Sequence, residues 1–181
     1  MNCVIMHGCL GSSDRNYPEH WIPWAKDTLT KKGILTETPI ASTPWLPEYD
    51  KFKAVFEKCL VDENSVLVGH SGGGAFLVRW LGETKKKIRK LILVAPWKIN
   101  NHGDKYRDEF YTYTIDATIK DRVGNIVMFT SNDEYPEGKE SLRMFHDALG
   151  GEIINLKDHG HYRERNMGTV EFPELIEAIL K

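Results

Sequence analysis

Short apolar runs alternate along the whole chain with longer amphipathic segments. Val, Ile and Leu dominate the short runs, which is typical of strands buried on both faces of a parallel sheet. We predict six strands, at Asn2–Met6, Ile34–Thr38, Ser65–Val68, Ile88–Val94, Asn125–Thr130 and Glu152–Leu156. Helices are expected between them, at about Glu19–Lys32, Glu48–Leu60, a segment around Ala75–Leu81, Gly138–Leu149 and Phe172–Leu180. Repeated strand–helix units predict an α/β fold with a mostly parallel sheet and helices on both faces.

Length and composition limit the possible classes of protein. A chain of 181 residues with 41% hydrophobic residues can bury one core, so a single domain over 1–181 is expected. Its net charge of −2, with acids and bases interspersed, favours neither a nucleic-acid nor a membrane partner. The chain has no membrane-length apolar run, no signal peptide and an odd number of cysteines, three, so we expect a cytoplasmic protein with reduced thiols. Its oligomeric state stays open between a monomer and a weak dimer.

The glycine-rich stretch "VLVGHSGGGAF", residues 67–77, contains the pattern G-x-S-x-G from Gly69 to Gly73. A dinucleotide-binding turn would need glycine where Ser71 stands, and the Gly-Lys-Ser/Thr of a phosphate-binding loop is absent from the sequence. After a buried strand and before a helix, G-x-S-x-G predicts a sharp turn that exposes the serine as a nucleophile. We therefore expect catalysis by Ser71 and no cofactor.

Ligands of open parallel sheets bind beyond the carboxyl ends of the strands, so residues there are candidate partners of Ser71. Asp133 follows the fifth strand and could orient a histidine, although an N-cap or an Asx turn is the alternative. His159 and His161 follow the sixth strand, in "LKDHGHYRERNMG". The order Ser71, Asp133, His161 is that of the α/β-hydrolases. A metal held by the two histidines is disfavoured because no H-E-x-x-H pattern and no nearby carboxylate ligand is evident.

A second glycine-rich turn, "HGCLGSS", follows the first strand. Such a turn can aim backbone N–H groups at a developing oxyanion, and we expect the donors to be the N–H groups of Cys9 and Gly72. Tight packing is the alternative reason for these glycines. His7 is expected to be a turn residue, and His20, with His102 and His146, a surface residue.

The substrate pocket is expected near the same edge of the sheet. Candidate pocket residues are Leu10, His70, Trp97, Phe110 and Tyr135, with His70 as structural support rather than as a catalytic group. The stretch between Trp97 and Arg122 is short and polar, which predicts a minimal lid and a shallow aromatic rim suited to a small acyl group. Either residues 98–121 or the loop 162–171 could gate this site.

Five segments together carry a resemblance to a known family: "VIMHGCLGS", "HWIPWAKDTL", "LVGHSGGG", the aspartate in "SNDEYP", and "GHY". The chain resembles the compact serine hydrolases that include YdeN-like proteins and retinoblastoma-binding serine hydrolases. This resemblance implies a three-layer, Rossmann-like α/β-hydrolase fold of six mostly parallel strands, and a triad of Ser71, Asp133 and His161. Glu134, which directly follows Asp133, stays open as the alternative acid.

The expected activity is hydrolysis of small carboxylic esters, thioesters or amides through an acyl-enzyme, without metal or cofactor. The partner would then be a small acyl substrate. The alternative is a protein-interaction module on a catalytically weak hydrolase scaffold. The sequence lacks Leu-x-Cys-x-Glu, the segment associated with retinoblastoma binding, and it retains all triad members, so we favour the enzyme.

Overall fold

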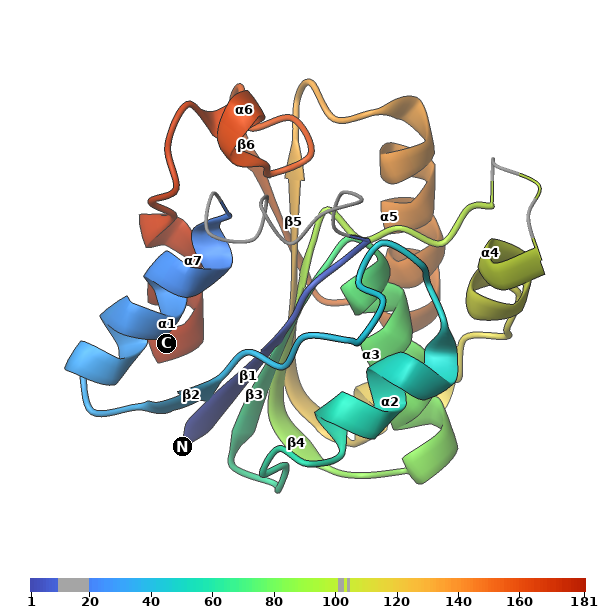
Figure 1. The fold of residues 1–181 in the computed structure, drawn as a ribbon, viewed down its shortest axis with the longest axis horizontal. Coiled ribbons are helices and arrows are strands. Elements are labelled where there is room, and N and C mark those ends of the chain that lie inside the picture. The colour runs from blue at the N-terminus through green and yellow to red at the C-terminus, as the bar shows by residue number, and fades with distance from the viewer. Residues whose placement is uncertain (10–19, 101–102, 104) are drawn as a thin grey trace.

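The computed structural model describes residues 1–9, 20–100, 103 and 105–181. Its strands form one six-stranded sheet in the order β2-β1-β3-β4-β5-β6, and every neighbouring pair is parallel (Figure 1). The strands are β1 Asn2–Met6, β2 Leu35–Glu37, β3 Ser65–His70, β4 Ile88–Val94, β5 Val123–Ser131 and β6 Glu152–Leu156. The six predicted strands are confirmed, and the sheet is entirely rather than mostly parallel.

Helices cover both faces of this sheet. The helices expected from the sequence are α1 Trp21–Lys31, α2 Tyr49–Phe56, α3 Gly72–Thr84, α5 Pro136–Leu149 and α7 Pro173–Leu180. α1 and α7 lie on one face, and α2, α3 and α5 lie on the other (Figure 1). Three further short elements are α4 Lys105–Tyr111, the 3-10 helix η2 Ala117–Asp121 and α6 Glu164–Met167. The sequence did not predict these three, because one or two turns carry little periodicity.

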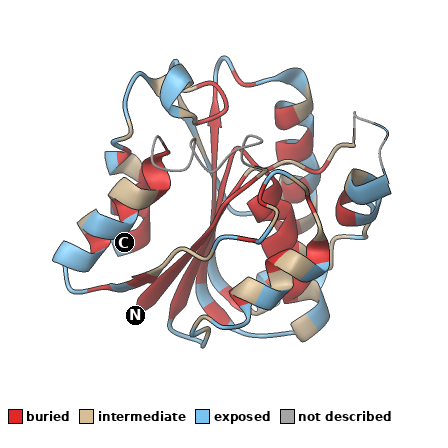
Figure 2. Cartoon of the chain, in the orientation of Figure 1, coloured by how far each residue is buried: buried red, intermediate tan, exposed pale blue. Residues whose placement is uncertain are grey.

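The central strands of the sheet are buried on both faces, which explains their continuous apolar runs. In β1, Val4 and Met6 pack into the core beneath α2 and α3, whereas Cys3 and Ile5 pack into the core beneath α1 and α7. All four side chains are fully buried, and the central strands are correspondingly red in Figure 2. Two separate apolar cores therefore hold the sheet in place.

The strand order reverses at β1, because the chain continues to β2 on one side of it and β3 lies on the other. α1 and α3 then leave toward opposite faces, and ligands of such sheets bind beside this reversal, here at the carboxyl ends of β1 and β3. Met6 pairs with Gly69, so the turn that begins at His7 lies beside the turn that contains Ser71. The two glycine-rich segments of the sequence meet at this point.

Gly73 allows the start of α3 to lie directly against the end of β1. A Cβ atom added there would stand 2.4 Å from the Met6 carbonyl oxygen and 2.5 Å from that of His7. No side chain fits between these backbones.

A chain of hydrogen bonds between buried histidines connects α1 to the loop after β6. His20 caps α1 by accepting the Ile22 N–H at Nδ1, so its proton lies on Nε2, which donates to His70 Nδ1 at 3.2 Å. His70 Nε2 then donates to the carbonyl oxygen of His161 at 2.9 Å. The expectation that His20 is a surface residue is wrong, because its capping role and its contact with His70 bury the ring.

His7 makes a similar connection at the end of β1. Its Nε2 accepts the Ala41 N–H at 3.0 Å, and its Nδ1 donates to the Gly8 carbonyl oxygen. Burial lowers the pKa of His7 to about 4 and that of His20 to about 3, and it holds the pKa of His70 well below its usual value. These three histidines are therefore neutral in the folded protein at pH 7.

We expect Gly73→Ala to destabilise the protein by several kcal/mol, because the new methyl group would overlap two carbonyl oxygens of β1. Gly82→Ala in the same helix is the matched control. The added Cβ there meets only the Asp116 Cβ, at 3.3 Å, and alanine raises the helix propensity by about 1 kcal/mol. Urea denaturation of the two variants measures the difference. A Gly73→Ala protein as stable as the Gly82→Ala protein would contradict the close approach.

The free energy of unfolding should fall as the pH drops below about 6.5, the ordinary histidine pKa of the unfolded chain. His7, His20 and His70 take up protons in the unfolded state but not in the folded state until much lower pH. Each histidine can therefore add up to about 1.4 kcal/mol per pH unit to the slope of the free energy of unfolding against pH. Carboxylates titrate near pH 4, so denaturation between pH 7 and 5 reports mainly on the histidines.

His20→Asn, which retains a capping side chain, should reduce this slope, and His146→Gln at a partly exposed position should leave it unchanged. Constant stability of the unmodified protein between pH 7 and 5 would contradict the assignment of neutral buried histidines.

Candidate active site

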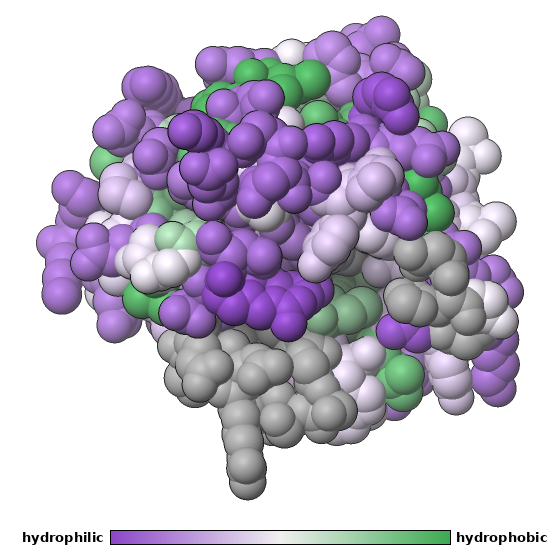
Figure 3. Space-filling view, turned by 90° about the horizontal axis from the view of Figure 1, so that it is seen from above, coloured by the Kyte–Doolittle hydropathy of each residue, from purple (hydrophilic) through white to green (hydrophobic). Residues whose placement is uncertain are grey.

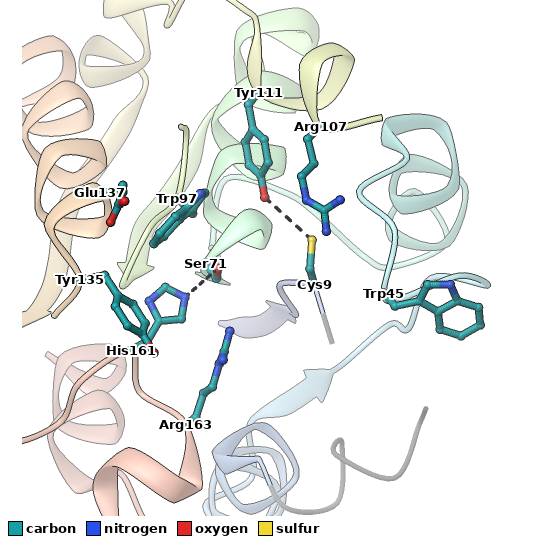
Figure 4. A pocket seen from close by; sticks show the side chains of 10 residues that line it. All are labelled: Cys9, Trp45, Ser71, Trp97, Arg107, Tyr111, Tyr135, Glu137, His161 and Arg163. Carbon is teal, nitrogen blue, oxygen red and sulfur yellow. Dashed lines mark hydrogen bonds between the residues drawn. The ribbon is translucent and has the colours of Figure 1, made fainter. Parts of the chain in front are cut away.

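Ser71 occupies the sharp turn between β3 and α3 that the sequence predicts. Its backbone has φ 51° and ψ −123°, a conformation that residues with side chains rarely adopt. The turn is held by hydrogen bonds from the Ser71 N–H to the Val94 carbonyl oxygen at 2.9 Å and from the Gly74 N–H to the Ser71 carbonyl oxygen at 3.0 Å. The surrounding structure therefore fixes a strained residue whose hydroxyl faces a pocket (Figure 4).

His161 lies between the Ser71 hydroxyl and a buried carboxylate. Its Nε2 is 2.9 Å from Ser71 Oγ, and its Nδ1 is 2.9 Å and 3.1 Å from the two carboxylate oxygens of Glu134. The side chains of His161 and Glu134 are almost completely buried. Serine, imidazole and carboxylate thus form a continuous line at hydrogen-bonding distances, which is the arrangement that general-base activation of a hydroxyl requires.

The structure places Asp133 away from this line, which corrects the expectation that its carboxylate contacts His161. Asp133 accepts hydrogen bonds from the Ser131 hydroxyl and, at 2.8 Å, from the Gly160 N–H. These bonds lower the pKa of the Asp133 carboxyl. At the end of β5 the Glu134 N–H bonds to the Ser131 carbonyl oxygen, and this turn points Glu134 into the protein while Asp133 stays exposed. Asp133 instead ties the turn to the loop that carries His161.

His159, the other candidate histidine, does not reach Ser71. Its Nδ1 hydrogen-bonds to the Lys157 carbonyl oxygen at 2.6 Å, and its ring packs against Tyr162. The choice of His161 over His159 therefore agrees with the geometry.

The turn after β1 approaches the nucleophile turn closely. A Cβ on Gly8 would lie 2.7 Å from Ser71 Cβ and 3.4 Å from the Gly72 nitrogen. Gly72 is the first residue of α3, so its N–H has no acceptor within the helix. Cys9 lines the pocket, with its Sγ 3.9 Å from Tyr111 Oη (Figure 4). The structure thus brings the two residues that are expected to supply oxyanion donors, Cys9 and Gly72, to the same end of the pocket as Ser71.

A pocket of about 460 Å³ opens at Ser71. The residues that line it are Cys9, Trp45, Ser71, Trp97, Arg107, Tyr111, Tyr135, Glu137, His161 and Arg163 (Figure 4). Figure 3 shows the molecule from the side toward which the carboxyl ends of the strands point, and the surface there is mainly hydrophilic. Trp97 and Tyr135 are at the pocket as the sequence predicts, and the Trp97 ring stands perpendicular to the His161 ring at 5.4 Å.

Two other expected pocket residues lie elsewhere. His70 is buried behind His161, with the ring centroids 5.3 Å apart. Phe110 is in the core, edge-on to Phe52 at 5.2 Å, because α4 turns this face inward. Tyr111, the next residue, reaches the pocket instead. Leu10 lies outside the described residues.

Sequence reasoning missed the charged groups of this pocket: Arg107, Glu137 and Arg163. Arg163 had a signal in the sequence, because it follows His161 by two residues in the loop after the last strand. Tyr162, between them, is anchored in the core by its hydroxyl, which donates to the Thr130 carbonyl oxygen at 2.6 Å. Its backbone has φ 54°, and with the intervening ring buried, both His161 and Arg163 face the pocket (Figure 4).

Metal ligands and membrane-spanning helices can be assigned only in the part of the chain that the structure describes. Within it, no group of three or more histidine, cysteine, aspartate or glutamate side chains is placed to hold a metal ion. Within the same residues, no helix has the length and apolar character needed to cross a membrane.

The chain is similar over nearly its whole length to known proteins. The family described as serine hydrolase matches residues 3–180. Bacillus subtilis YdeN is 23% identical over 181 residues, covering 97% of this chain and 92% of YdeN. The crystal structure of the B. subtilis ydeN gene product superimposes with a TM-score of 0.83 at 21% identity, covering 99% of this chain and 97% of that one.

Two solved esterases or hydrolases share the fold at lower identity. The carboxylesterase CesB of B. subtilis has a TM-score of 0.59 at 13% identity, covering 99% of this chain and 82% of CesB. A pyrethroid hydrolase from Sphingobium faniae has a TM-score of 0.67 at 14% identity, covering 99% and 96%. The chain has the α/β-hydrolase fold and belongs to the serine hydrolase family.

Proposed function

We propose that this protein hydrolyses small carboxylic esters through an acyl-enzyme formed on Ser71. The observation that carries the proposal is the line from Ser71 Oγ through the two nitrogens of His161 to the buried Glu134 carboxylate. Thioesters and amides undergo the same chemistry, and esters are chosen because solved structures with this fold include a carboxylesterase. The similarity to that carboxylesterase concerns the fold, whereas the proposed chemistry rests on the geometry of the site.

In the first step Ser71 Oγ attacks the ester carbonyl carbon while His161 Nε2 accepts the hydroxyl proton. Glu134 holds the Nδ1 proton of the imidazole and stabilises the positive charge that develops on the ring. His161 then donates its proton to the leaving alcohol oxygen as the ester bond breaks. In the second step water attacks the acyl-enzyme with His161 again as the base, which releases the acid and restores Ser71.

The negative charge on the carbonyl oxygen needs fixed donors beside Ser71. We assign this role to the backbone N–H groups of Cys9 and Gly72, since the close approach of Gly8 places that turn against the start of α3. Donors of this kind cost no reorganisation during the reaction, and a single donor contributes about 10²–10³ in rate.

The size and lining of the pocket support a small substrate. A volume of about 460 Å³ is near the lower end of ligand pockets, and aromatic side chains from Trp97, Tyr111 and Tyr135 form part of its wall. These rings can bury a short acyl or aryl group. Much of the remaining lining is charged, which is unfavourable for a long alkyl chain.

A fluorophosphonate probe should label the folded protein at neutral pH and leave Ser71→Ala unlabelled, because the probe phosphonylates only an activated serine. His161→Ala should lose nearly all labelling. His159→Ala is the matched control and should retain it, since that ring does not reach Ser71. The readout is covalent mass change on the intact protein. An unlabelled native protein with an intact fold would contradict the proposed function.

Glu134→Gln should lower kcat for a 4-nitrophenyl ester by about 10²–10⁴, because an amide can no longer stabilise the imidazolium. Asp133→Asn should reduce kcat by less than about tenfold, since this carboxylate contacts Ser131 and Gly160 rather than His161. Steady-state kinetics and thermal midpoints of both variants separate catalysis from folding. A larger loss in Asp133→Asn, at unchanged stability, would restore Asp133 as the acid.

A further inference from the structure

Arg163 lines the pocket but has no role in the proposed acyl transfer. Arg163 is the N-cap residue of α6, but its side chain does not cap that helix. Among the described residues, no hydrogen bond or ion pair with its guanidinium is found, although the group is partly buried. Figure 4 shows the side chain rising into the pocket between His161 and Cys9. Its donors therefore face the space that a substrate would occupy.

The position of Arg163 is fixed by the core rather than by the solvent. The preceding residue, Tyr162, is fully buried, and its carbonyl oxygen accepts the Trp21 Nε1–H at 3.0 Å. Burial lowers the pKa of the Arg163 guanidinium, and the positive charge of Arg165 acts in the same direction. Arginine remains protonated at neutral pH even so, which leaves a partly desolvated positive charge in the pocket.

The other charges of the pocket are distributed unevenly. Arg107 also lines the pocket, and in Figure 4 it approaches Cys9 from α4 on the side away from Tyr135. Glu137 lies on the opposite side, beyond Trp97. The carboxylate of Glu134 is engaged by the imidazole of His161 and by the Tyr135 N–H. Within the described residues, the end of the pocket beside Cys9 therefore carries the guanidinium groups of Arg163 and Arg107.

We infer that Arg163 binds a carboxylate on the substrate, at the end of the pocket that Arg107 also lines. The substrate class is then a small ester that carries a free carboxylate, such as a monoester of a short dicarboxylic acid, rather than a neutral ester. A planar guanidinium can donate two parallel hydrogen bonds to a carboxylate, and a site that excludes water strengthens them. This inference rests on the proposed ester hydrolysis and adds its specificity.

The first experiment compares two esters of equal length. One is mono-4-nitrophenyl glutarate, and the other is its neutral analogue, in which the free carboxylate is an amide. After subtraction of uncatalysed hydrolysis, kcat/KM of the native protein should be at least about tenfold higher for the anionic ester. Arg163→Gln should lose most of this preference while its kcat/KM for the neutral ester changes less than about threefold.

Arg165→Gln is the matched control, because this arginine lies two residues further on and is exposed. It should leave both values unchanged. Equal kcat/KM of the native protein for the two esters would overturn the inference but not the proposed hydrolase activity. Loss of the neutral ester's turnover in Arg163→Gln to the same extent as the anionic ester's would also overturn it.

The second experiment measures binding without turnover. Glutarate should bind to Ser71→Ala in calorimetry, and the double variant with Arg163→Gln should lose this binding. Inorganic phosphate is the competing anion, and tighter binding of phosphate than of glutarate would overturn the carboxylate assignment. If the native protein cleaves neither ester and does not react with fluorophosphonate, the proposed hydrolase function is wrong. The proposed substrate class is then wrong too, even if glutarate binds.

Discussion

The close packing of α3 against the end of β1 is the constraint on which the site depends. Because Gly73 lacks a side chain, the first turn of the helix lies directly on the carbonyl groups of Met6 and His7. The chain can reach that position from β3 only through a tight turn, and Ser71 takes the strained conformation there. The same approach brings Gly8 against Ser71, so one backbone contact fixes the candidate nucleophile beside the turn that carries Cys9, one of the two proposed oxyanion donors.

The other half of the site is held by different interactions. The loop after β6 is fastened by Tyr162 in the core, by the Asp133 carboxylate at Gly160, and by His70 at the His161 carbonyl oxygen. His70 is in turn fixed by His20 at the start of α1. The backbone of His161 is therefore connected to the end of β3, to the start of α1 and to β5. Such support keeps an imidazole at hydrogen-bonding distance from a hydroxyl without any contribution from a substrate.

Most of the fold, and two residues of the candidate triad, could be predicted from the sequence. The strands are apolar on both faces, and Ser71 and His161 follow strands whose carboxyl ends meet at one edge. The choice between Asp133 and Glu134 could not be predicted, because it depends on how one four-residue turn is rotated at the end of β5. The sequence also could not predict that His70 and Phe110 lie outside the pocket, since this depends on which side of a strand end or of a short helix faces the core.

The loop after β6 also joins chemistry to recognition. Tyr162 is buried, and the residues on either side of it reach the pocket, one as the proposed base and the other as the proposed carboxylate ligand. A shift of this loop would therefore displace the imidazole and the guanidinium together. In the proposed reaction Glu134 would balance the charge of the imidazolium, whereas Arg163 has no carboxylate at hydrogen-bonding distance among the described residues. An anionic substrate would supply the missing charge, and it would bring its ester group to the serine in the same step.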